Sequence, residues 1–146
     1  MRIIAHGIDL VDIARVERML AVHGHRFEER CFSPGERAYA NAGRRRRAER
    51  FAVRLACKEA VMKALGTGWR SGIAWTDIEV VRSPSGQPHI ALAGRSAAAA
   101  AHLGIDQWHL SLTHTESQAA ASVIACSSRP ADDAIPMPRS GPVQQI

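Results

Sequence analysis

Aromatic residues and long apolar runs are scarce in this chain of 146 residues, and each absence excludes a class of protein. Aromatic side chains make up 5% of the sequence, which is too few for the stacking surfaces that bind single-stranded nucleic acid. No apolar run approaches the roughly 18 residues of a membrane-spanning helix, and the first residues lack the pattern of a signal peptide. We therefore expect a soluble cytoplasmic protein that binds neither a membrane nor a nucleic acid.

Cysteine is scarcer still, with three residues, Cys31, Cys57 and Cys126, that lie far apart in the sequence. An odd number excludes a fully paired disulfide framework, and no two cysteines have the short spacing of metal ligands. We therefore expect reduced thiols, with Cys57 buried in a helix.

Positive charge is in excess, with 19 Lys and Arg against 14 Asp and Glu. Residues 127–146 contain two Arg and two Asp, so the excess of +5 belongs to the preceding part of the chain. That part is rich enough in apolar residues for a core, whereas residues 127–146 show no periodicity. The sequence predicts one folded domain over residues 1–126, a disordered tail over residues 127–146, and an acidic partner or phosphorylated ligand for the basic domain.

The pattern of apolar residues predicts a mixed arrangement of helices and strands. Serine, proline and glutamate at positions 33, 34 and 36 are typical of a helix start. Strands separated by short turns are expected to pair as antiparallel hairpins, so the fold class is α+β. We expect strands at residues 3–8, 78–81, 89–92, 107–113 and 119–126, and helices from about residue 12 to 24, from residue 34, over 50–65 and over 95–103.

The stretch over residues 50–68 organises the rest of the chain. It reads as a helix that is apolar over most of its circumference and is therefore expected to be buried. Yet it carries Lys58, Glu59 and Lys63, and unpaired charges are costly to bury. Glu59 and Lys63 also have the spacing of an ion pair along one helix. Charges on a mostly buried helix indicate a cleft that holds a ligand.

Asp9 is the second acidic residue of interest, and it follows the first predicted strand. One interpretation is a carboxylate that caps the next helix; the other is a metal ligand where strand gives way to helix. If Asp9 and Glu59 meet, two carboxylates without cysteine or clustered histidine suit a hard cation such as Mg²⁺. Lys63 and the backbone N–H groups of the loop formed by Gly66, Thr67 and Gly68 could then hold phosphate oxygens.

Two motifs carry a resemblance to a known family. GIDLVDIARVE at residues 7–17 and RLACKEAVMKALGTG at residues 54–68 resemble the signature motifs of the 4'-phosphopantetheinyl transferases, and in particular of the small bacterial holo-[acyl-carrier-protein] synthases. GQP at residues 86–88 and WHLSLTHT at residues 108–115 are also similar to that family. The departures, Leu55 and Leu65 where an aromatic residue is frequent, affect packing and not chemistry.

The resemblance implies an antiparallel sheet packed against a long buried helix, and an enzyme that moves 4'-phosphopantetheine from coenzyme A to a serine of an apo carrier protein. It implies that Asp9 and Glu59 hold Mg²⁺, that Glu59 takes the serine proton, and that Lys63 contacts the pyrophosphate. His114 could instead be an ordinary residue at a strand end, and Lys63 could merely pair with Glu59. The further coenzyme A contacts implied are Arg54, Lys58, Gly66, Thr67, Gly68, Ser111, Thr113 and His114.

The resemblance also implies partners: an acidic acyl carrier protein of fatty acid biosynthesis, docking on Arg15 and Arg18, and two further copies in a homotrimer whose neighbouring subunits complete each site. Three alternatives stay open. The carrier could be a polyketide-type one, the protein could bind coenzyme A without transfer, or the arginine run at residues 44–47 could make it a nucleic-acid-binding module.

Overall fold

The computed structural model describes residues 1–68 and 72–129. Its centre is a three-stranded antiparallel sheet in the order β1-β5-β4, formed by β1 (Arg2–Asp12), β5 (Gln118–Ser127) and β4 (Gln107–His114). A separate two-stranded sheet pairs β2 (Ile78–Arg82) with β3 (Pro88–Leu92). The α+β class and the antiparallel pairing are therefore confirmed.

The strand β1 is longer than the six residues that its apolar run predicts, and it includes Asp9. Gly7, Asp9 and Val11 face the protein interior while Ile8 and Leu10 face outward, so the alternation of a strand continues to Asp12. The next helix begins at Ile13 and its N-cap is Asp12. The interpretation of Asp9 as a helix cap is therefore wrong.

The helix α4 (Arg47–Leu65) packs against the inner face of the sheet, chiefly against β1 and β5. It begins three residues before the predicted start, and it ends as predicted at Gly66, whose φ of 68° is left-handed. Gly7 permits the close approach of β1, because a Cβ there would lie 1.9 Å from the backbone oxygen of Ala60. This contact brings the residues beside Gly7 onto the middle of α4.

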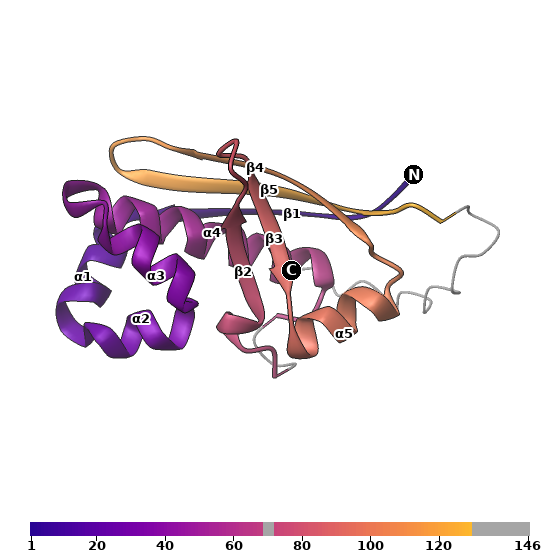
Figure 1. The fold of residues 1–146 in the computed structure, drawn as a ribbon, viewed down its shortest axis with the longest axis horizontal. Coiled ribbons are helices and arrows are strands. Elements are labelled where there is room, and N and C mark those ends of the chain that lie inside the picture. Colours follow the sequence, from indigo (N-terminus) through magenta and orange to yellow (C-terminus); the bar gives the residue numbers. More distant parts are fainter. Residues whose placement is uncertain (69–71, 130–146) are drawn as a thin grey trace, which may run out of the picture.

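Shorter elements surround α4 (Figure 1). Ser33 and Glu36 form the predicted capping box, in which the Ser33 hydroxyl accepts from the Glu36 N–H and the Glu36 carboxylate accepts from the Ser33 N–H. The three cysteines are free and Cys57 is buried, as expected; Cys31 and Cys126 are buried as well. The elements are α1 (Ile13–His23), α2 (His25–Cys31), α3 (Pro34–Asn41), the 3₁₀ turns Arg44–Arg46 and Trp75–Asp77, and α5 (Gly94–His102).

The predicted tail begins too early. Ser127 is the last residue of β5 and is 1% exposed, and Ser128 donates its backbone N–H and its hydroxyl to the Asp106 carboxylate at 2.8 and 2.5 Å. The prediction for residues 130–146 lies outside the described residues. Within the part of the chain that is described, no helix is both long and apolar enough to cross a membrane.

Candidate active site

Asp9 and Glu59 lie together at the contact between β1 and α4. Asp9 is 9% exposed, and its Oδ1 accepts a hydrogen bond from the Lys63 ammonium at 2.7 Å. Lys63 also donates to the backbone oxygen of Ile8 at 2.9 Å, so its ion pair is with Asp9 and not with Glu59. Burial, and after it the negative charge of Asp9, raise the pKa of Glu59 to about 7.

This carboxylate pair fits a hard divalent cation. The Oδ2 atom of Asp9 is buried and has no hydrogen-bond partner, and the carboxylate of Glu59 is close enough to Asp9 for the two to repel. A cation between them would satisfy the unpartnered oxygen and relieve the repulsion. Among the described residues no cluster of three or more His, Cys, Asp and Glu side chains is available to a metal ion, so ligand oxygens and water would complete the coordination.

A cavity of about 360 Å³ lies beside Glu59, between α4, α1 and α2. Arg15 lines it, as does Leu55, whereas Arg18 is exposed on α1 outside the lining. Arg26 and Arg30 of α2 also line it and were not among the predicted site residues. A count of positive residues in α2 could have indicated them. The lining consists of Arg15, Met19, His23, Arg26, Phe27, Arg30, Cys31, Leu55, Glu59 and Trp75.

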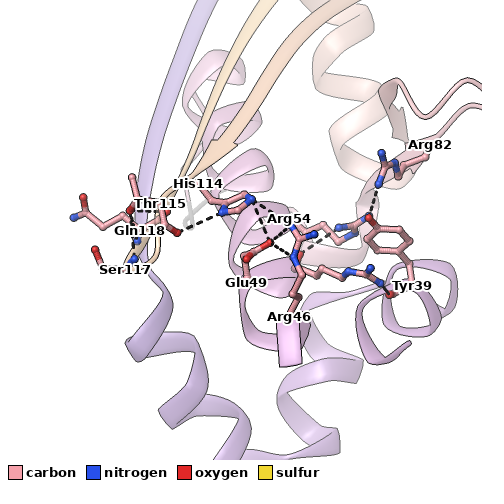
Figure 2. A network of polar contacts seen from close by, with 10 residues as sticks. Tyr39, Arg46, Glu49, Arg54, Arg82, His114, Thr115, Ser117 and Gln118 are labelled. Atoms are coloured by element: carbon pink, nitrogen blue, oxygen red, sulfur yellow. Dashed lines mark hydrogen bonds and ion pairs between the residues drawn. The ribbon is translucent and has the colours of Figure 1, made fainter. Parts of the chain in front are cut away.

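A second cavity, of about 260 Å³, lies on the other side of α4, beside β4 and the β2–β3 hairpin. Figure 2 shows that side chains from α3, α4, β2 and β4 converge there. Arg54 and His114, two of the predicted coenzyme A contacts, line it, whereas Tyr39, Arg50 and Arg82 were not among the predicted site residues. The lining consists of Tyr39, Arg46, Glu49, Arg50, Val53, Arg54, Val80, Arg82, Gly86, Pro88, Leu112 and His114.

The run at residues 44–47 is partly neutralised. Arg46 pairs with Glu49 at 2.6 Å, and Arg47 pairs with the buried carboxylate of Glu28 at 2.5 Å. His114 joins the first pair, with Nε2 lying 3.3 Å from Glu49 Oε1. Two of the four arginines are therefore engaged in ion pairs, which weakens the attraction of this run for the phosphates of a nucleic acid.

Lys58 must be removed from the predicted coenzyme A contacts. It is fully buried, and its ammonium donates to Glu36 at 2.7 Å and to the backbone oxygens of Cys31 and Trp75 at 2.8 and 3.1 Å. These acceptors use all three of its hydrogens, so none is left for a phosphate. Lys58 instead connects α4 to α2, α3 and the turn before β2.

Two further groups of predicted contacts are also placed differently. Ser111 and Thr113 are exposed on the outer face of the sheet, because side chains alternate along β4 and only Leu112 and His114 face the second cavity. The N–H groups of Gly66 and Thr67 donate to the last carbonyls of α4, at 3.1 and 3.3 Å, so they close the helix and do not face a ligand. Gly68 lies in the loop that follows.

Comparisons with known proteins identify the family. Residues 5–123 match the model of the 4'-phosphopantetheinyl transferase superfamily. The chain is 44% identical over 122 residues to a holo-[acyl-carrier-protein] synthase of Koribacter versatilis, covering 84% of this chain and 97% of the relative. It is 47% identical over 117 residues to one of Gloeobacter violaceus, covering 80% and 88%.

Solved structures agree with the sequence comparison. A holo-(acyl-carrier-protein) synthase from Bacillus anthracis, in complex with CoA (3',5'-ADP), has a TM-score of 0.71 and 33% identity over 88% of this chain and 100% of that one. The Helicobacter pylori synthase, in complex with coenzyme A, has a TM-score of 0.72 and 30% identity over 83% and 99%. The family model and these relatives together show that the chain belongs to the 4'-phosphopantetheinyl transferase superfamily.

Proposed function

We propose that this protein is a holo-[acyl-carrier-protein] synthase of the cytoplasm that serves fatty acid biosynthesis. It transfers 4'-phosphopantetheine from coenzyme A to a serine of an apo-acyl carrier protein and releases adenosine 3',5'-bisphosphate. The observation that carries the proposal is the pair of Asp9, which is buried, and Glu59, which is partly buried, beside Lys63 and the first, arginine-lined cavity. Relatives named as such synthases, and neighbours solved with coenzyme A, support it.

In the proposed reaction, the serine oxygen forms a bond to the phosphorus that carries the pantetheine arm, and the bond from that phosphorus to the oxygen bridging the pyrophosphate breaks. Asp9 and Glu59 would hold Mg²⁺, which when bound would neutralise charge that develops on the leaving phosphate. Glu59, which lines the first cavity, takes the serine proton. The side chain of Lys63 is 56% exposed, so its ammonium can turn from Asp9 to the pyrophosphate.

The second cavity suits the nucleotide end of coenzyme A, which carries a phosphate at the ribose 3' position. Its lining contains four arginines and one carboxylate, so the balance of charge favours an anion. Arg54 is 5% exposed, and its Nε has no hydrogen-bond partner. A phosphate oxygen would satisfy that donor.

The same geometry supports a homotrimer. Asp9 lies on β1 and His114 on β4, at opposite edges of the sheet with β5 between them, and the two cavities share no lining residue. The outer face of β1 is apolar, with Ile3, Ile8 and Leu10 exposed by 66%, 61% and 59%. A neighbouring copy covering this face could bring its second cavity toward the carboxylates of the first copy and complete the site.

The first cavity suits the carrier protein. Arg15, Arg26 and Arg30 surround its opening beside Glu59, and Arg18 extends the basic surface along α1. An acidic carrier would be attracted to this surface, and its serine would arrive next to the proposed base.

The decisive experiment is intact-mass spectrometry of an apo-acyl carrier protein incubated with the enzyme, coenzyme A and Mg²⁺. We expect a gain of one phosphopantetheine group, abolished by a chelator and by D9A or E59Q, and retained by R37Q, whose arginine lies outside both cavities. Coenzyme A binding without any mass gain would favour a non-catalytic protein. Faster modification of a polyketide-type carrier than of the fatty-acid carrier would change the proposed substrate and leave the chemistry intact.

A further inference from the structure

Tyr39 lines the second cavity, and the proposed reaction gives it no role. Its ring contacts three guanidinium groups, with centroid-to-Cζ distances of 4.4 Å to Arg50, 4.1 Å to Arg54 and 5.3 Å to Arg82. Its backbone oxygen accepts from Arg50 at 2.8 Å, and its hydroxyl accepts from Arg82. Figure 2 shows Arg54 and Arg82 directed toward Tyr39.

These three arginines are not neutralised by carboxylates. Within the described residues, their hydrogen bonds go to backbone oxygens and to the Tyr39 hydroxyl, and none of the three forms an ion pair. Arg46, by contrast, pairs with Glu49 at the edge of the same cavity. Three like charges this close repel one another, so another group must hold them together.

The tyrosine ring can do so, because the negative face of an aromatic ring attracts cations. The hydroxyl adds a directional bond to Arg82, which also donates twice to the backbone oxygen of Gly86, at 3.1 and 3.0 Å. Tyr39 thereby links α4 to the β2–β3 hairpin. Without the ring, repulsion would turn the guanidinium groups outward into solvent.

We propose that Tyr39 is a positioning residue that holds Arg50, Arg54 and Arg82 in a converging arrangement, so that the cavity selects coenzyme A over 3'-dephospho-coenzyme A. This inference rests on the proposed function and assigns one of its specificity determinants. A 3'-phosphate offers oxygens to several guanidinium groups at once, whereas a 3'-hydroxyl leaves their charge unpaired. Arginines that are already converged need no reordering when the phosphate binds.

The test compares kcat/KM for coenzyme A and for 3'-dephospho-coenzyme A in four proteins: wild type, Y39F, Y39L and R37Q. We expect wild type to prefer coenzyme A, and Y39L to lower that preference about tenfold through coenzyme A alone. Y39F retains the ring and loses only the bond to Arg82, so its preference falls about threefold. R37Q changes an arginine of the same helix that pairs with Glu29, and it keeps the wild-type preference.

Binding of adenosine 3',5'-bisphosphate and of AMP, measured by calorimetry, separates this inference from the proposed function. If the wild-type protein transfers no phosphopantetheine but still binds the bisphosphate more tightly than AMP, the proposed function is overturned and the assignment of the cavity to the 3'-phosphate is supported. If Y39L lowers kcat/KM equally for coenzyme A and for 3'-dephospho-coenzyme A, at an unchanged melting temperature, the positioning role is overturned. If Y39L does not fold, the test rests on Y39F. A ratio of kcat/KM for the two substrates equal to that of wild type would then overturn the inference.

Discussion

Asp9 and Glu59 are closer together than two ionised carboxylates in a buried site favour. The charge of Lys63 compensates for one of them, and the Oδ2 atom of Asp9 stays without a partner. Glu59 responds with a raised pKa, because burial and the neighbouring negative charge both oppose its ionisation. The two carboxylates repel one another when both are ionised, and a divalent cation would relieve that repulsion.

The raised pKa of Glu59 makes the stability of the metal-free protein depend on pH. A group whose pKa rises on folding, here from 4.5 to about 7, stabilises the folded state below the lower value and loses that contribution as the pH rises through the higher one. In a chelator we expect the melting temperature of wild type to fall between about pH 5 and about pH 8 more than that of E59Q. An equal dependence of melting temperature on pH in the two proteins would contradict this. Added Mg²⁺ should weaken that dependence in wild type alone.

Lys58 illustrates how a charge can be buried for structure. In K58M the Glu36 carboxylate would lose its cation in the core, and two backbone carbonyls would lose their donor. We expect a loss of about 3–5 kcal/mol in the free energy of unfolding by denaturant titration. The double variant K58M/E36Q should recover part of this loss because no unpaired charge remains; a loss in K58M below about 1 kcal/mol would show that the pair contributes little.

At the scale of elements, the contact of β1 with α4 determines the active site. Gly7, two residues before Asp9, places the strand directly on the backbone of the helix at Ala60, the residue after Glu59. Any side chain at this position would separate strand and helix, and with them the two carboxylates.

We therefore expect G7A to lower the free energy of unfolding by about 3 kcal/mol, because the new methyl group meets a backbone oxygen that cannot move away alone. G66A is the matched control: its methyl group would lie in open space, and only the left-handed φ of 68° costs about 1 kcal/mol. Denaturant unfolding of both variants checks this. A smaller loss in G7A than in G66A would show that the close approach is not needed for stability.

Local patterns predicted several elements well. The alternation along β4, the glycine that ends α4 and the capping box of α3 each depend on neighbouring residues, so the sequence reveals them. The length of β1 was underestimated because Asp9 interrupts its apolar run, although its burial follows the strand alternation. The burial of Lys58 could not be predicted, since its partner Glu36 lies on another helix.

At the scale of the whole molecule, the outer face of the sheet is the feature that one chain leaves unexplained. Ile8 and Leu10, on the edge strand β1, are more than half exposed on this face, and the proposed trimer would cover them. A charge placed there would have to be buried in the assembly without a partner.

We expect I8K and L10K to sediment as smaller species than wild type and to lose transferase activity at low protein concentration. V22K is the control for sedimentation, because Val22 is 74% exposed on α1, away from the sheet, and should leave the sedimentation coefficient unchanged. Analytical ultracentrifugation with a carrier-protein assay measures both. A wild-type sedimentation coefficient in I8K and L10K would contradict the proposed role of this face.

The sequence by itself determined the family and the fold class, and it singled out Asp9, Glu59 and Lys63 as candidate site residues, because motifs and periodicities are properties of nearby residues. Only the tertiary structure decided that Asp9 meets Glu59, fifty positions away, since that depends on how closely β1 approaches α4. It also decided that Lys58 serves the core, and that arginines from α4 and β2 converge on one tyrosine of α3. Such contacts join distant segments, and their geometry follows from packing that no local pattern encodes.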